Sequence, residues 1–165
     1  MKKMILILAV MLTGFTSRAV AQEAMAKNNP IEGVWQYVEE ISRADGKTLI
    51  MGKQIYKTIT ADNKYMVMIG VNIPVKSSEE GNVQMSTLTF VTQQGEMEFT
   101  SENTYLEYIN DHYLDPNLNN TISSLKFRFD DNRPNILYVE YFLGGTDDGS
   151  WTSEVWMRVM PYGAK

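Results

Sequence analysis

The sequence contains no cysteine, which excludes disulfide bonds and lipid attachment at a cysteine. Its only histidine is His112, and zinc is usually bound by several histidine or cysteine side chains, so we expect no metal site. One histidine without a G-x-S-x-G segment gives no basis for a serine–histidine–aspartate triad. Neither a P-loop nor a dinucleotide fingerprint occurs. We therefore expect no cofactor.

The chain beyond residue 30 also lacks the i, i+3, i+4, i+7 apolar spacing of amphipathic helices. Apolar and polar residues alternate instead, which indicates strands. The connections are too short for the crossovers of about a dozen residues that parallel strands need. A long antiparallel meander removes its edges by closing on itself. We predict an all-β fold, a single up-and-down antiparallel barrel of eight to nine strands, with a sandwich as the alternative.

The expected strands have short turns between most of them. Asp45-Gly46 and the "QQGE" segment at 93–96 are expected turns, 74–82 a polar loop, and 111–120 an irregular loop with room for one helical turn. In the second strand Ile55, Lys57 and Ile59 share one face. The expected strands are 33–42, 54–60, 65–71, 83–92, 97–100, 104–110, 124–130, 136–142 and 151–160.

The first 21 residues have the pattern of a secretory signal peptide. Lys2 and Lys3 precede an apolar run over 4–12, and 19–21 reads Ala-Val-Ala, a cleavage pattern. A spanning helix would need about 20 apolar residues, so we expect no membrane span. We expect cleavage after residue 21, a flexible spacer over 22–30, a barrel domain over 31–162, and a soluble protein exported to the periplasm or beyond.

The chain is acidic, with 15 basic and 20 acidic residues. Cleavage would remove Lys2, Lys3 and Arg18 and no acid, which leaves 12 basic residues and a net charge of −8. Such a protein repels phosphate backbones and anionic lipid. Nucleic acid is therefore not an expected partner, whereas a small-molecule ligand is compatible with the charge; the sequence does not indicate an oligomeric state.

Three residues at the two ends of the barrel region carry a resemblance. Gly33 and Trp35 form a G-x-W on the first expected strand, and Arg158 lies on the last. This pattern resembles the lipocalins and the wider calycin superfamily, in which the tryptophan packs across the closed end of the barrel beneath a basic side chain. The resemblance implies that Gly33, Trp35 and Arg158 close the barrel, with a cation–π contact of about 1–2 kcal/mol between the last two.

A closer resemblance covers the whole chain after the signal. The segments P-x-x-G-x-W at 30–35, Y-x-E-x-I at 105–109, D-P-x-L at 115–118 and E-V-W-x-R-V at 154–159 occur in that order. The set is similar to an exported bacterial family of lipocalin-like domains of unknown function. It implies the barrel fold and no activity. Residues 144–150, "GGTDDGS", widen the last expected hairpin relative to that pattern.

Aromatic and acidic side chains on the expected strands are the candidates for a ligand site. Tyrosine suits sugar or aromatic ligands, but it also suits ordinary strands. Glu107 and His112 are candidate acid–base groups if they face a cavity. Glu107 could instead face solvent or pair with a cross-strand Lys or Arg, and His112 could be a solvated loop residue. The candidate ligand contacts are Tyr37, Tyr56, Tyr105, Glu107 and Trp156.

Three functions are compatible with the predicted barrel and its candidate site residues. The first is a binding protein that holds a small, largely apolar or aromatic molecule in the barrel, which rests on analogy of fold. The second is an enzyme of isomerase or decarboxylase type that uses a carboxylate and a tyrosine in the same cavity. The third is a barrel filled by its own side chains that contacts an envelope partner, because about eight strands can be just filled. We favour the first and therefore expect no catalysis.

Overall fold

The computed structural model describes residues 29–76, 83–143 and 151–159. The expected signal peptide, residues 22–28 of the spacer and the widened turn at 144–150 lie outside this part of the chain. No helix within the described part is long and apolar enough to cross a membrane. The elements are β1 Gly33–Ser42, β2 Thr48–Ile59, β3 Lys64–Lys76, β4 Val83–Ser101, β5 Thr104–His112, the 3-10 helix η1 Pro116–Leu118, β6 Thr121–Phe129, β7 Ile136–Leu143 and β8 Thr152–Arg158.

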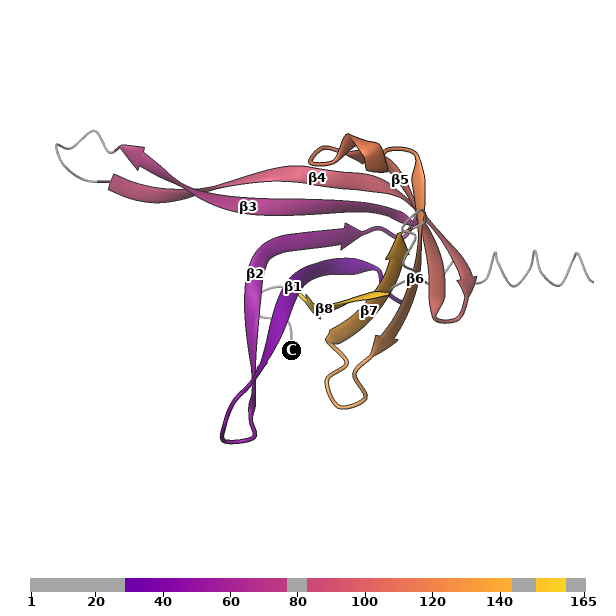
Figure 1. The fold of residues 1–165 in the computed structure, drawn as a ribbon, viewed down its shortest axis with the longest axis horizontal. Helices are drawn as coiled ribbons and strands as arrows, with labels where there is room; N and C mark the ends of the chain where they lie inside the picture. Colours follow the sequence, from indigo (N-terminus) through magenta and orange to yellow (C-terminus); the bar gives the residue numbers. More distant parts are fainter. Residues whose placement is uncertain (1–28, 77–82, 144–150, 160–165) are drawn as a thin grey trace, which may run out of the picture.

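The eight strands form a closed up-and-down barrel, as predicted. Each strand pairs antiparallel with the next, and β8 returns to β1. Figure 1 shows the barrel together with a long β3–β4 ribbon that projects away from it. The turns 43–47 and 113–120 lie at the end from which the ribbon projects, and the turns 60–63, 102–103 and 130–135 lie at the opposite end, because the chain reverses direction at each strand.

Strand alternation determines which residues form the core. On β6, Leu125 and Phe127 are buried, whereas Lys126 and Arg128, which alternate with them, are exposed, as the period of two predicts. The same rule turns Ile59 of β2 and Tyr105 of β5 inward. These side chains join one apolar cluster with Trp35 at the end of the barrel opposite the ribbon. That end is therefore filled by side chains.

The prediction of a turn at 93–96 is wrong, and it accounts for the ninth expected strand. β4 runs through this segment without a break, and a bulge between Gln94 and Gly95 takes up the irregularity. A Cβ on Gly95 would lie 1.9 Å from the Tyr108 carbonyl oxygen, so the glycine is needed for close approach of two strands. A glycine inside a strand pattern can mark a bulge as well as a turn.

Several strands are longer than predicted. β2 begins at Thr48 rather than at residue 54, and β3 continues to Lys76 through Pro74, which was expected in a loop. Proline is tolerated there because this part of β3 has a strand partner on one side only, β4. β5 extends to His112, and the short helical turn expected in the following loop is confirmed as η1.

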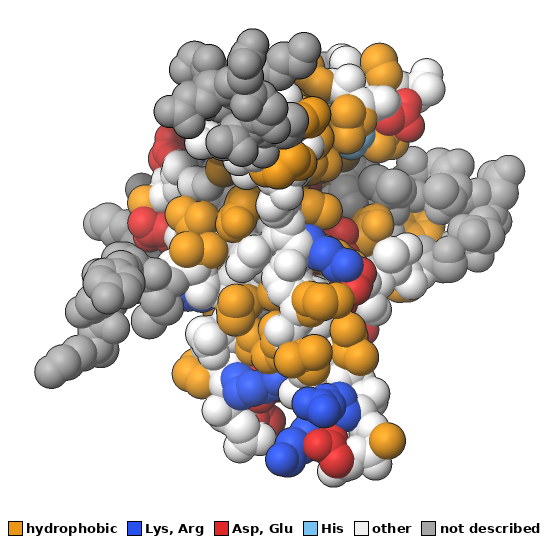
Figure 2. Space-filling model, turned by 90° about the vertical axis from the view of Figure 1, so that its left-hand side faces the viewer, with side chains coloured by type: hydrophobic (Ala, Val, Ile, Leu, Met, Phe, Trp, Pro, Cys, Tyr) orange, Lys and Arg blue, Asp and Glu red, His pale blue; other side chains and the backbone are white. Residues whose placement is uncertain are grey.

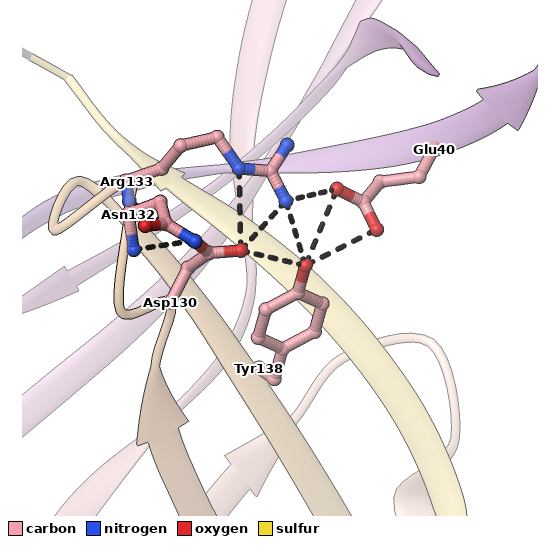
Figure 3. Close-up of polar contacts among 5 residues, drawn as sticks. All are labelled: Glu40, Asp130, Asn132, Arg133 and Tyr138. Carbon is pink, nitrogen blue, oxygen red and sulfur yellow. Dashed lines mark hydrogen bonds and ion pairs between the residues drawn. The ribbon is translucent and has the colours of Figure 1, made fainter. Parts of the chain in front are cut away.

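A cluster of polar side chains on the outside of the barrel joins the β6–β7 turn to β1 (Figure 3). Arg133 Nη2 donates to Asp130 Oδ2 at 2.7 Å and to Glu40 Oε1 at 2.8 Å. The Tyr138 hydroxyl lies between them, 2.9 Å from the same Arg133 nitrogen. The hydrogen bond to Arg133 is the main reason that the pKa of Asp130 falls from 3.8 to about 2.

The lowered pKa of Asp130 predicts how this cluster responds to acid. A carboxyl with a depressed folded-state pKa stabilises the fold fully above 3.8, and this contribution is lost as the pH falls toward about 2. We expect Asp130→Asn to melt at a lower temperature than the unaltered protein at pH 7, and the difference to shrink between pH 4 and pH 2. Thermal denaturation over that pH series measures it. Asp131→Asn, at an exposed neighbour, is the control; an unchanging difference for Asp130→Asn would contradict the assignment.

Candidate functional site

A cavity of about 450 Å³ lies inside the barrel above the filled end. Seven strands, all except β4, and the η1 turn contribute its aliphatic and aromatic lining. Because these side chains come from alternate positions of their strands, the same alternation that builds the core also builds the cavity wall. The apolar lining residues are Tyr37, Ile55, Val67, Ile109, Leu118, Leu125, Tyr141 and Trp156, and the polar ones are Lys57, Gln93, Glu107, His112, Ser123 and Glu154.

An ion pair crosses this cavity. Lys57 Nζ of β2 contacts Glu107 Oε1 of β5, and the two residues are only 9% and 4% exposed. β2 and β5 are separated by β3 and β4, so the pair joins strands that are not neighbours in the sheet. The Lys57 ammonium also lies 4.9 Å from the centre of the Tyr65 ring. The attraction between the two charges offsets the cost of burying them only while both partners stay in place. Removing either one would leave the other charge buried and unpaired.

A second carboxyl, that of Glu154, lies on the β8 side of the cavity. The Trp156 indole N–H donates to its Oε2 at 2.9 Å. Burial raises the pKa of Glu154, while the nearby Lys57 charge and the indole hydrogen bond act in the opposite direction. Glu154 therefore keeps its proton to a higher pH than an exposed glutamate does.

Two tyrosines lie close to the charged pair. Burial and the negative charge of Glu107 raise the pKa of Tyr65, whose hydroxyl accepts a 2.8 Å hydrogen bond from Gln93. The same two causes raise the pKa of Tyr105 well above its ordinary value. Both phenols therefore stay neutral at physiological pH.

The β1–β8 side of the cavity is an aromatic wall. The rings of Tyr37 and Trp156 meet edge to face, with centroids 5.6 Å apart, because these residues are directly paired across the two strands. Tyr141 of β7 lines the cavity as well. Edge-to-face packing fixes the orientation of the rings, so the wall offers a rigid apolar surface next to the charged groups.

Of the candidate ligand contacts, Tyr37, Glu107 and Trp156 line the cavity, but Tyr56 and Tyr105 do not. Tyr56 alternates with the inward residues of β2, and its hydroxyl lies 3.4 Å from the Gln36 side chain on the outer face. Tyr105 is 2% exposed and packs between Phe99 and Phe127 in the filled end, so ring contacts there replace contact with the cavity.

The two candidate acid–base residues, Glu107 and His112, both line the cavity. Glu107 lies within β5, and His112 is the last residue of that strand. Glu107 faces inward, and it is also paired with Lys57. An inward position and pairing with a basic side chain, which were considered as alternatives for this residue, therefore occur together. The lysine is not on a strand adjacent to β5. His112 lies at the end of β5, where its Nδ1 accepts the Asp115 backbone N–H at 2.8 Å. That bond leaves Nε2 as the nitrogen that can donate. No group of three or more His, Cys, Asp or Glu that could hold a metal occurs among the described residues.

Four of the polar lining residues were not predicted as site residues: Lys57, Gln93, Ser123 and Glu154. For Lys57 the sequence did carry a signal, because a lysine between two isoleucines on one strand face must either reach solvent or find a buried partner. Glu154 is separated from Trp156 by one residue and therefore shares its face. Gln93 lies in the segment that was expected to be a turn, so its inward orientation was not predicted.

The three residues of the expected barrel closure are brought together at the filled end. Trp35 is 1% exposed, its indole N–H donates to the Ile31 carbonyl at 2.8 Å, and the Arg158 guanidinium lies 4.2 Å from the ring centre. Gly33 has φ +135°, and a Cβ there would lie 2.6 Å from Arg158 Nη1. Any other residue at 33 would strain the backbone and displace the guanidinium.

The fold and its interior cavity define the class of the protein: a lipocalin-like, eight-stranded antiparallel barrel. Residues 30–163 match the family described as a domain of unknown function, DUF4488, and the chain belongs to that family. No curated protein matches the chain.

Proposed function

We propose that this chain is an exported, calycin-like binding protein that holds a small ligand in its barrel. The cavity of about 450 Å³ beside a buried ion pair carries the proposal. Ligand sites typically measure about 300–1,000 Å³ and combine an apolar wall with a few convergent polar groups. Export, with a signal over 1–21, a spacer over 22–30 and a domain over 31–162, is supported by Lys2, Lys3 and the apolar run that follows them.

The lining indicates the chemical class of the ligand. Tyr37 and Trp156 suit a flat or aromatic body, and the aliphatic side chains around them suit an apolar one. The polar end of the ligand would face the Lys57–Glu107 pair and Glu154, which together offer donors and acceptors. We therefore propose a mainly apolar or aromatic molecule with at least one hydrogen-bonding group.

Native mass spectrometry of the protein, purified gently from expressing cells, is the direct test. An extra mass that is reproducible and disappears on denaturation would support a bound ligand and give its mass. An unliganded protein that also fails to bind an anilinonaphthalene sulfonate dye would contradict the proposal and favour the barrel as a partner-binding scaffold. Chemical conversion of the bound compound would instead favour an enzyme.

Two tyrosines provide a matched pair of variants for this test. Tyr37 lines the cavity, whereas Tyr56 lies on the outer face, and both are half-buried. We expect Tyr37→Ala to weaken binding of the co-purified compound or dye about tenfold, since each tenfold is about 1.4 kcal/mol, the size of a lost ring contact. Tyr56→Ala should leave the dissociation constant within about twofold. Equal effects of the two variants would place the ligand elsewhere.

A further inference from the structure

The charges on the wall of the cavity do not balance. Two carboxyl groups, those of Glu107 and Glu154, face one lysine, Lys57. Lys57 pairs with Glu107, and within the described part of the chain no ion pair joins Glu154 to a basic side chain. His112 also lines the cavity, but its Nδ1 accepts the backbone N–H of Asp115, an arrangement that only the neutral imidazole allows. With both carboxyl groups ionised, one positive and two negative charges give the lining a net charge of −1.

Glu154 lies among three aromatic rings from adjacent strands. It shares its face of β8 with Trp156, whose indole N–H donates to its Oε2 at 2.9 Å. Tyr37 of β1 is paired with Trp156, and the two rings meet edge to face. Glu154 is paired with Val139 of β7, so Tyr141, two residues farther along β7, is its diagonal neighbour on the same face. Burial, and then the negative charge of Glu154, raise the pKa of Tyr141, as expected for groups that lie close together.

This combination of groups favours a cation over an anion. The face of an aromatic ring is negative, so it attracts a positive charge, most strongly where water is excluded. A carboxylate beside the rings attracts the same charge. An anion would be repelled by Glu154, and Lys57, the one lysine of the lining, is already paired with Glu107. A neutral ligand would leave the Glu154 carboxylate without a counter-charge, and the burial of this group is what raises its pKa.

The charges outside the cavity act in the same direction. The chain has 20 acidic and 15 basic residues, and an acidic protein attracts cations and repels anions. Figure 2 views the molecule from the side to which the β3–β4 ribbon points. Most of the Lys and Arg side chains on this face lie at its lower end, and hydrophobic side chains cover much of its upper and middle parts (Figure 2). The basic side chains are thus not spread over this face, where they would repel a cationic ligand.

We propose that the ligand carries a positive charge, as an ammonium or another organic cation, which lies beside the Glu154 carboxylate and against the three surrounding rings. This inference rests on the proposed function, because it specifies the ligand of the same cavity. A single positive charge would bring the sum of the charges in the cavity from −1 to zero. The remainder of the ligand, which the proposed function makes apolar or aromatic, would contact the aliphatic part of the lining.

Three probes that share a naphthalene ring test the charge of the ligand by isothermal titration calorimetry of the whole protein at pH 7. They are 1-naphthylmethylamine, which is a cation at this pH, 1-naphthalenemethanol, which is neutral, and 1-naphthoate, which is an anion. The amine should bind at least about tenfold more tightly than the alcohol, because its charge contacts the carboxylate and the rings. The acid should bind most weakly, through its ring alone. Because these titrations use the unaltered protein, they do not depend on the folding of a variant.

Two glutamates provide matched variants for the amine. Glu154 lines the cavity, whereas Glu140 of the neighbouring strand β7 is exposed on the outer face. Glu154→Gln removes the charge and keeps the shape of the side chain, so it should weaken amine binding at least about tenfold and alcohol binding no more than about threefold. Glu140→Gln removes the same charge from the outside and should leave both dissociation constants within about threefold. Thermal denaturation would check that both variants are folded.

Three results would overturn the inference, and they separate it from the proposed function. If the alcohol or the acid binds as tightly as the amine, the cavity holds a ligand but does not select a cation. If Glu154→Gln weakens the amine and the alcohol equally, Glu154 shapes the cavity and does not pair with the charge of the ligand. If none of the three probes binds, the binding function itself fails, and the inference fails with it.

Discussion

Replacing Lys57 with methionine is expected to destabilise the protein by about 3–5 kcal/mol, because the change leaves the Glu107 carboxylate buried without its counter-charge. Methionine keeps the length and most of the volume of the lysine stem, so packing is largely preserved. The quantity to measure is the free energy of unfolding in urea at pH 7. Glu107 is 4% exposed, and little water can replace the lost partner.

A surface pair on the same strand is the matched control for this experiment. Lys53 contacts Glu39 at 2.8 Å, but both side chains are more than one-third exposed. Lys53→Met should therefore cost about 1 kcal/mol or less. Adding Glu107→Gln to Lys57→Met should recover much of the loss, because it removes the unpaired charge. If Lys57→Met were no more harmful than Lys53→Met, water or a conformational change would be solvating Glu107, and the pair would not be the fixed polar end of the cavity.

Trp35→Ala is expected to cost about 3–5 kcal/mol, the usual range for removing a large buried ring. The indole is 1% exposed, contacts Arg158 and Phe129, and donates a hydrogen bond to the Ile31 carbonyl. Its removal would leave a void at the filled end and take away the ring beneath the Arg158 guanidinium, which would keep its hydrogen bond to the Glu32 carbonyl. The measurement is again chemical denaturation, with near-UV circular dichroism to follow the tertiary packing of the rings.

Trp151 offers the comparison within the same chain. It is 41% exposed and contacts Phe142 and Lys126 on the outside of the barrel. Trp151→Ala should cost about 1 kcal/mol or less, since an exposed cation–π contact is worth about 0.5–1 kcal/mol. A loss below about 1 kcal/mol for Trp35→Ala would be too small for a buried ring and would show that the barrel does not depend on this residue for closure.

The sequence predicted the barrel well because the barrel follows from local rules. Alternation identified the inward faces of β2 and β6 from residues two positions apart, and the short turns required antiparallel neighbours. The prediction was wrong where one signal has two structural meanings. Gly95 marks a bulge rather than a turn, and only its approach to the Tyr108 carbonyl on the next strand distinguishes the two.

The candidate site was harder to predict because its contacts are not local. Glu107 was a candidate, and Lys57 was noted on an inward face, but nothing in the sequence shows that β2 and β5 face each other across the barrel. That relation depends on the tilt and curvature of all the strands between them. Tyr105 was assigned to the same cavity as Glu107, whereas two positions along a strand, about 7 Å, are enough to move a side chain from the cavity into the packed end.

The order of the strands also bears on how the chain folds. Seven of the eight strand pairings are hairpins between consecutive strands, but the β1–β8 pairing joins Trp35 to Arg158, 123 residues apart in the chain. During synthesis from the N-terminus, the hairpins can form one after another as they emerge. The β1–β8 pairing, which is the seam of the barrel, cannot form until β8 has been synthesised. Until then Trp35 lacks Arg158 above its ring. The unfinished barrel therefore presents an indole at its open seam, a site that a chaperone can bind and that the last strand to emerge then covers.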